Sequence, residues 1–237
     1  MSKDVHFGVA KVSKYATSES GDTLEMIERP HGGLSFVLVD GQRSGKSAKA
    51  ISNIVARKAI QLLAEGVRDG AAARAAHDYL YTHRKGKVSA TLNILSVDGE
   101  TKTFVISRNN EAPVIVYTPE QGIFLLDEPC RSVGTHRNTK PIITELPITV
   151  GMLIVVFTDG LRHAGSLSGT NNYDPAAAVS RMLTDGVMDS QVMANTLLEE
   201  AMAMDNGRPR DDISVLVAYV KDTQDTEIRR MEVHLPL

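Results

Sequence analysis

Residues 34–41 read LSFVLVDG, a nearly continuous apolar run that ends at Asp40 and a glycine. A run of this kind predicts a strand that is buried on both faces. Residues 154–160, IVVFTDG, have the same design, because their apolar run ends at Asp159 and again at a glycine. We therefore expect two buried central strands, each with an acid at its end.

Further acids lie at other predicted strand ends. Asp211 and Asp212 immediately precede the apolar run 213–220, and Asp22 begins another strand. Strands of stacked sheets begin and end at the rims, so acids from four such ends can converge. Convergent carboxylates raise one another's pKa unless a cation lies between them. Oxygen-only sites suit Mg²⁺ or Mn²⁺ rather than zinc. A single Asp-Gly is more often a plain turn, and it is the recurrence that favours a metal site.

The order of elements predicts strands, a helix pair, a series of strands, a second helix pair and a closing strand. Consecutive strands joined by tight turns indicate antiparallel sheets, because parallel neighbours need long crossovers. We expect an α+β fold in which the sheets stack and the helices cover their outer faces. The predicted helices are 47–63, 71–83, 174–183 and 189–204, and the predicted strands are 5–12, 23–27, 34–39, 88–97, 102–107, 113–117, 122–126, 142–146, 152–158, 213–220 and 227–235.

The composition excludes several classes of protein. The chain has 237 residues, 26 Lys and Arg against 29 Asp and Glu, and one cysteine, Cys130. A lone cysteine excludes a disulfide framework and a multi-cysteine zinc site. The net charge of −3 argues against a nucleic-acid partner, and no apolar run is long enough to span a membrane. Without a signal-peptide pattern, we expect a soluble, cytoplasmic protein.

One motif offers an alternative interpretation. Residues 41–47, GQRSGKS, lie between a predicted strand and a predicted helix, as a phosphate-binding P-loop does. That loop has four residues between its first glycine and Gly-Lys, whereas this chain has three. The glycine would fall at Asp40, whose charge repels phosphate. A nucleotide-binding protein is therefore the less favoured reading.

Five short motifs, in order from residue 20 to about 220, resemble the PPM (type 2C) metal-dependent protein serine/threonine phosphatases. The similarity is closest to the bacterial branch, which includes the stage II sporulation protein E phosphatase domain and stress-response phosphatases. The motifs are Ser20-Gly21-Asp22, Val39-Asp40-Gly41 with 44–48, Ser89-Ala90-Thr91-Leu92, Phe157-Thr158-Asp159-Gly160 and Arg210-Asp211-Asp212-Ile213-Ser214. The resemblance implies an αββα sandwich of two antiparallel β-sheets flanked by helix pairs. It also implies one domain over 1–237, with a motif core of about 20–220 and a C-terminal extension over 221–237.

The resemblance also implies the chemistry. The ligands of two Mn²⁺ or Mg²⁺ ions would be Asp22, Asp40, Asp159, Asp211 and the carbonyl of Gly41, with Asp40 bridging and a third ion left open. A water activated by the metals would attack phosphoserine or phosphothreonine on a partner protein, so the acids act through bound metals and water. The implied substrates belong to sigma-factor regulation, such as an anti-anti-sigma or stressosome-type protein. The oligomeric state is left open.

Some residues depart from the family pattern. Arg43 and Lys46 stand in the stretch where many bacterial members carry Gly-His-Gly, and His163 replaces a common glutamate. Asn109 and its neighbour replace a glycine-histidine pair. With Asp212, these residues are candidates for an outer shell or a substrate contact. The alternative function is a binding module that has kept the fold and lost turnover, which the intact set of four acids argues against.

Overall fold

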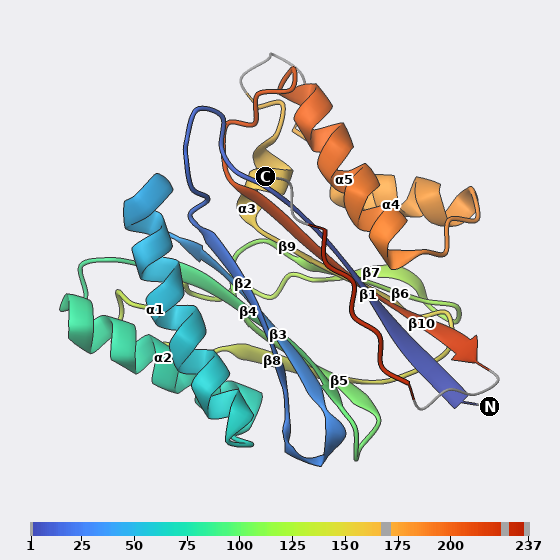
Figure 1. Ribbon diagram of the computed structural model, residues 1–237, viewed down its shortest axis with the longest axis horizontal. Coiled ribbons are helices and arrows are strands. Elements are labelled where there is room, and N and C mark those ends of the chain that lie inside the picture. Colours follow the sequence, from blue (N-terminus) through green and yellow to red (C-terminus); the bar gives the residue numbers. More distant parts are fainter. Residues whose placement is uncertain (1, 167–171, 224–227, 235–237) are drawn as a thin grey trace.

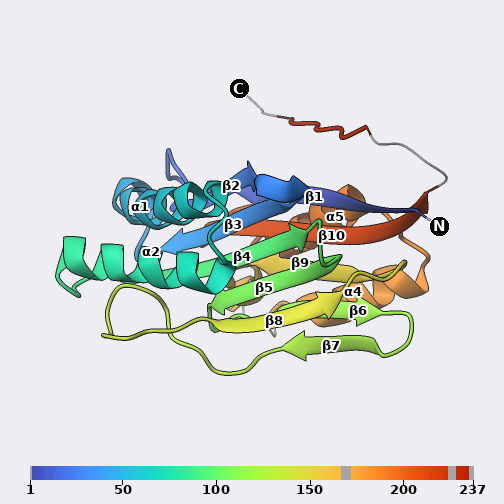
Figure 2. The same ribbon diagram turned by 90° about the horizontal axis from the view of Figure 1, so that it is seen from below.

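Two stacked antiparallel sheets form the centre of the protein. The computed structural model describes residues 2–166, 172–223 and 228–234. All strand neighbours in both sheets pair antiparallel. The first sheet has the order β1 (Ser2–Val12), β10 (Ile213–Thr223), β9 (Leu153–Phe157), β6 (Val114–Thr118) and β7 (Gly122–Leu126). The second has the order β2 (Asp22–Glu28), β3 (Leu34–Gly41), β4 (Ala90–Asp98), β5 (Thr103–Asn109) and β8 (Ile142–Pro147) (Figure 2).

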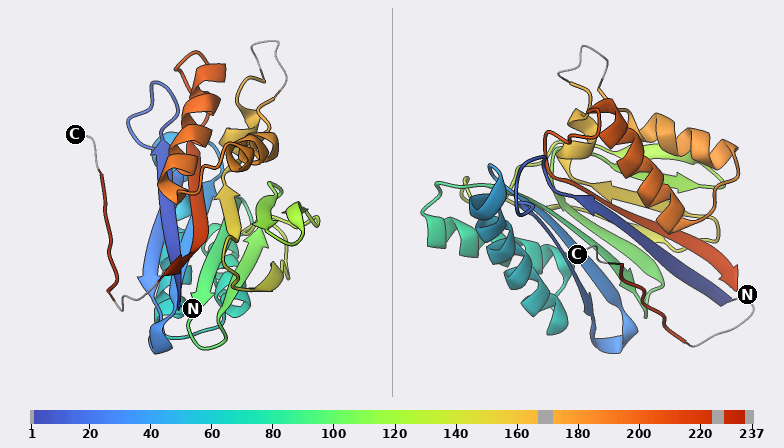
Figure 3. Two further views of the ribbon diagram at one scale, coloured as in Figure 1. Left: turned by 90° about the vertical axis from the view of Figure 1, so that its right-hand side faces the viewer. Right: turned by 45° about the horizontal axis from the view of Figure 1, so that its top comes forward.

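Helix pairs cover the outer faces of the two sheets (Figures 1 and 3). The second sheet is covered by α1 (Gly45–Ala64) and α2 (Asp69–Arg84), and the first by α4 (Pro175–Thr184) and α5 (Ser190–Met204). Two short helices complete the fold, η1 (Pro30–Gly32) and α3 (Asp159–His163). The predicted α+β class and the αββα sandwich are confirmed.

The core explains why the central strands are so apolar. One cluster of buried side chains lies between the sheets, and each helix pair packs on a further cluster. Along β9, Val155 packs toward α4 and α5, whereas Ile154 and Val156 pack between the sheets. Successive side chains of a strand point to opposite faces, so a strand with two buried faces needs apolar residues at nearly every position.

The predicted starts of the second helix pair, 174 and 189, fall on the residues that cap these helices. Asp174 and Asp189 cap α4 and α5, because each carboxylate accepts hydrogen bonds from two backbone N–H groups of the first turn. The short helix α3 was not predicted. The strand predicted over 152–158 ends instead at Phe157, and α3 begins directly after Thr158.

The C-terminal segment differs from the prediction. An edge strand was expected over 227–235, but residues 228–234 form no strand, and 227 and 235 lie outside the described residues. Arg229 instead donates a hydrogen bond from Nη2 to the Gly32 carbonyl oxygen at 3.0 Å, and its Nη1 lies 3.4 Å from Glu28 Oε1. The segment is therefore held to the second sheet by one arginine side chain rather than by a ladder of backbone bonds.

Candidate metal centre

Four aspartates converge at one rim of the sandwich, two from each sheet. Asp22 begins β2 and Asp40 lies near the end of β3, where the two residues are direct cross-strand partners. Asp159 follows β9 and Asp211 precedes β10, and these strands are neighbours in the other sheet. Three of the four acids, Asp40, Asp159 and Asp211, line a cleft of about 450 Å³ together with Gly41.

Asp22 is held from the opposite sheet. Its side chain is fully buried, and its Oδ2 accepts hydrogen bonds from Thr158 Oγ1 at 3.0 Å and Ser214 Oγ at 2.6 Å. Its Oδ1 is also buried, and no group in the described parts of the chain donates to it. A buried carboxylate oxygen without a partner is costly. A cation at Oδ1 would remove that cost, so this atom fits the metal that the resemblance implies.

The electrostatics of the rim also fit a cation. Burial, reinforced by the charges of Asp22, Asp159 and Asp211, raises the pKa of Asp40. Burial likewise raises the pKa of Asp22 and of Asp211. Such shifts show that a negative charge is unfavourable at this rim, and a divalent cation is the usual way to make it favourable.

The acids form a cluster of near neighbours rather than a closed ligand cage. In residues 2–166, 172–223 and 228–234, no three His, Cys, Asp or Glu side chains stand in positions ready to hold a metal ion. The Asp159 carboxyl group nevertheless lies near enough to Asp40 to raise its pKa. All four acids offer oxygen donors, and Asp22 Oδ1 has no partner within the described residues, so the residues present fit a hard divalent cation.

Close backbone approaches explain the glycines of the two Asp-Gly motifs. A Cβ on Gly41 would lie 2.1 Å from the carbonyl oxygen of Ala48, and a Cβ on Gly160 would lie 2.1 Å from that of Asp212. Only glycine allows the start of α1 to pack on the end of β3, and α3 to pack on the turn before β10.

Asp212 organises the backbone around the cluster. Its Oδ1 accepts from the N–H of Lys14 and its Oδ2 from the N–H of Gly21, both at 2.9 Å. Its own N–H donates to Asp211 Oδ1 at 2.9 Å. This aspartate thus ties the β1–β2 loop and the turn before β10 together.

The other sequence-predicted candidates are placed differently from one another. Arg43 lines the cleft, with a φ of +80° that is uncommon for a side chain other than glycine, whereas Lys46 is exposed on α1 and is not part of the lining. His163 is exposed, with Nδ1 4.0 Å from Asp159 Oδ2. Asn109 is buried and donates to the carbonyls of Arg131 and Lys140. It therefore holds a neighbouring loop and does not face the cleft.

Sequence analysis missed several residues of the site. Lys14 and Ser132 line the cleft, from the β1–β2 loop and from the segment between β7 and β8. Thr158 and Ser214 belong to the quoted motifs, but their bonds to Asp22 span 136 and 192 residues. Their position beside the acids was the only signal in the sequence, since no local pattern shows such distant partners.

Comparison with known proteins places the chain in a family. No curated protein sequence matches it. The sequence model described as stage II sporulation protein E (SpoIIE) matches residues 30–221. The chain belongs to the SpoIIE family. It is a SpoIIE-type PPM (PP2C) phosphatase domain, as the motifs predicted.

Solved structures share the fold of this SpoIIE-family chain. The phosphatase domain of SpoIIE from Bacillus subtilis, with a fragment of its regulatory domain, has a TM-score of 0.78 and 18% identity, over 94% of this chain and 65% of that one. RsbX in complex with magnesium has a TM-score of 0.69 and 17% identity, over 92% and 96%. The catalytic domain of the serine/threonine phosphatase PstP, with two manganese ions, has a TM-score of 0.68 and 14% identity, over 93% and 100%.

Proposed function

We propose that this protein is a metal-dependent phosphatase that hydrolyses phosphoserine or phosphothreonine on a partner protein. The observation that carries the proposal is the convergence of four aspartates from both sheets at one rim. Three of them line a cleft, and the fourth, Asp22, has its Oδ1 buried and unpartnered within the described residues. Membership of the SpoIIE family and the metal ions named for RsbX and PstP support it.

Different residues of the proposed site would bind the metals, orient a metal ligand and attract the phosphate. Asp22, Asp40, Asp159, Asp211 and the carbonyl of Gly41 would hold two Mn²⁺ or Mg²⁺ ions. Such ions supply a water nucleophile at neutral pH and neutralise charge on the phosphoryl group. Thr158 and Ser214 fix Asp22 Oδ2, and Oδ1 is the oxygen of this carboxylate that has no partner within the described residues and would bind a metal. Lys14 and Arg43 place cationic side chains in the cleft lining, where they would attract a phosphate.

The setting that we propose is bacterial signalling. A similar fold occurs within the structure of the RsbU and RsbW domains of Rv1364c from Mycobacterium tuberculosis, over 60% of that chain, and in a structure described for the bacterial stressosome. An anti-anti-sigma or stressosome-type phosphoprotein is the substrate that fits this setting, in the cytoplasm. Within the described residues, none of the helices has the length and apolar character needed to cross a membrane.

The two alternatives differ in their support. A nucleotide-binding P-loop would require β3 to lie in a parallel sheet, but β3 pairs antiparallel with both of its neighbours. A binding module without turnover would share the fold, and only an assay separates it from an enzyme.

The decisive assay is Mn²⁺-dependent release of phosphate from a phosphoserine peptide. The wild-type protein should be active, Asp40→Asn inactive, and Glu120→Gln, in an exposed turn, unchanged. A wild-type protein that is inactive with both Mn²⁺ and Mg²⁺ would contradict the proposed function.

A further inference from the structure

A concentrated positive charge lies beside the cleft, on two segments far apart in the sequence. Residues 81–89 and 131–140 together carry six Lys and Arg side chains and two histidines, and neither segment has an aspartate or glutamate. We call these two segments the basic surface. Its strongly basic residues are Arg84, Lys85, Lys87, Arg131, Arg137 and Lys140. The chain as a whole has a net charge of −3, so the charge of this surface is opposite in sign to that of the whole chain.

The two segments are joined to each other and to the fold. Ala90, which follows the first segment, exchanges two backbone hydrogen bonds with Val133, at 2.9 and 3.0 Å. The N–H of Gly134 donates to His77 Nδ1 of α2 at 3.0 Å, and Asn109 holds the carbonyls at both ends of the second segment. A surface ordered in advance loses little conformational entropy when it binds a partner.

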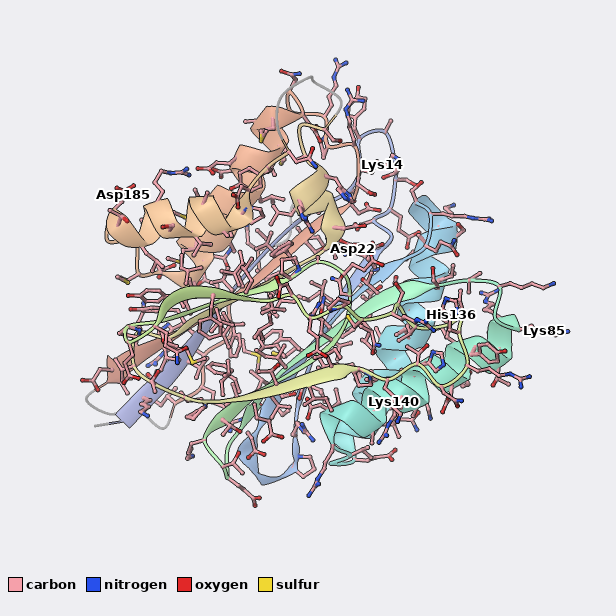
Figure 4. All side chains as sticks on the ribbon, turned by 180° about the vertical axis from the view of Figure 1, so that it is seen from behind. Lys14, Asp22, Lys85, His136, Lys140 and Asp185 are labelled. Atoms are coloured by element: carbon pink, nitrogen blue, oxygen red, sulfur yellow. The ribbon has the colours of Figure 1, made fainter. Side chains whose placement is uncertain are left out.

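The basic surface is continuous with the cleft. Ser89 and Ser132, one from each segment, line the cleft together with Asp40, Asp159 and Asp211. Five of the six Lys and Arg side chains are exposed, and Arg84 is half-buried. Figure 4 shows Lys85, His136 and Lys140 around α2, beyond the part of the rim where Asp22 and Lys14 lie.

We propose that the basic surface binds acidic residues that flank the phosphorylated residue of the protein substrate. The proposal rests on the proposed phosphatase function. A peptide whose phosphoserine occupies the cleft would extend over Ser89 and Ser132 onto this surface, at about 3.3 Å for each residue of extended chain. Cations that meet acidic side chains at a rim contribute mainly to specificity and to the rate of encounter.

Other anionic partners fit less well. A membrane-binding surface usually adds exposed apolar side chains to its lysines and arginines. Neither segment of the basic surface, both of which are fully described, has an exposed large hydrophobic residue. A nucleic acid would not need the surface to meet the phosphatase cleft, whereas a phosphoprotein substrate must.

The test compares two phosphoserine peptides of equal length, one with Asp and Glu around the phosphoserine and one with Asn and Gln at the same positions. The protein with Mn²⁺ should show a kcat/KM on the order of tenfold higher for the acidic peptide at low salt. The ratio should approach one at about 1 M salt, where charges are screened beyond about 3 Å.

Two triple variants locate the preference. Lys85→Glu with Lys87→Glu and Lys140→Glu should lower the ratio of the two kcat/KM values to about one or below. Arg57→Glu with Arg68→Glu and Arg74→Glu makes the same change in charge at exposed positions on α1, on the connection between the helices and on α2, and should keep the ratio. Arg74 lies about 16 Å from Lys85 along α2. Thermal unfolding of each variant with Mn²⁺ checks that it is folded.

The outcomes separate this inference from the proposed function. A wild-type protein that hydrolyses both peptides with equal kcat/KM would overturn the inference and leave the phosphatase function standing. A wild-type protein that hydrolyses neither would overturn both. Binding to phosphatidylserine vesicles or to single-stranded RNA that is lost in the first triple variant, with an unchanged peptide ratio, would also overturn the inference.

Discussion

Asp22 on β2 and Asp40 on β3 are direct cross-strand partners at the end of their ladder. Residues in this relationship have Cβ atoms about 4.5–5.5 Å apart on one face of the sheet, and like charges there destabilise the pair. The pairing of Asp22 with Asp40 therefore destabilises the folded protein unless a positive charge lies nearby. The following predictions test this relationship and the contacts that support it.

Asp40→Asn should stabilise the metal-free protein, because burial and the neighbouring acids already raise the pKa of Asp40 and so disfavour its charge. Relief of this repulsion should raise Tm in the presence of a chelator, by about 2–4 °C for each kcal/mol gained. Added Mn²⁺ should raise the Tm of the wild type and not that of the variant. A chelated variant that melts below the wild type would contradict the repulsion, and Glu120→Gln serves as the control.

Ser214→Ala should weaken Mn²⁺ binding on the order of 10- to 100-fold, because it removes a hydrogen bond that orients Asp22. Titration calorimetry measures this affinity without any substrate. The matched control is Ser107→Ala, since Ser107 is equally buried but its Oγ has no hydrogen-bond partner in the described structure. Equal affinities in the two variants would show that the bond to Asp22 has no role in metal binding.

Gly160→Ala should reduce both stability and metal affinity, because the new Cβ would lie 2.1 Å from the Asp212 carbonyl oxygen and push the turn before β10. Overpacking of this kind costs about 1–3 kcal/mol. Gly186→Ala is the comparison: among the described residues no atom lies within 4 Å of a Cβ added there, and only the φ of +75° opposes the change. Urea unfolding should show a loss in both variants, whereas calorimetry should show weaker Mn²⁺ binding only in the first.

The stability of the protein should fall below pH 6.5 in part because of His77. Burial lowers the pKa of this imidazole from its usual 6.5, and the neighbouring Asp78 opposes the shift only weakly. As the pH falls below 6.5, His77 becomes protonated in the unfolded chain while it stays neutral in the folded chain. The free energy of unfolding therefore decreases. Above pH 6.5 His77 makes no contribution to the pH dependence of the free energy of unfolding.

Urea unfolding at a series of pH values, with His77→Gln as the comparison, isolates this effect. The difference in free energy of unfolding between wild type and variant should change between pH 7 and pH 5 and stay constant above pH 7. A constant difference over the whole range would show that His77 titrates equally in both states.

Much of the fold could be predicted from the sequence because its central strands have two buried faces. Both faces of β3 and β9 need apolar residues, so a continuous apolar run was a reliable signal for them. The acids were found for a related reason, since a charge is tolerated only where such a run ends at the rim. The N-caps at Asp174 and Asp189 are local contacts and could be identified from adjacent residues.

The parts that could not be predicted depend on distant partners. The hydroxyl groups of Thr158 and Ser214 have no local feature that indicates a bond to Asp22 on the other sheet. Asn109 was predicted as a candidate because it stands in place of a glycine-histidine pair of the family, yet its amide holds a loop. Residues 227–235 have the composition of a strand, but a strand forms only where an edge pairs with it, and residues 228–234 do not pair.

The bonds from Thr158 and Ser214 to Asp22 join the first sheet to the second at the rim that carries the acids. A sliding movement of one sheet over the other would therefore separate the carboxylates pairwise, with Asp22 and Asp40 moving as one unit and Asp159 and Asp211 as the other. The distances between the two pairs of carboxylates thus depend on how the two sheets are aligned. A partner that shears the sandwich, even from its far end, would act directly on the cluster.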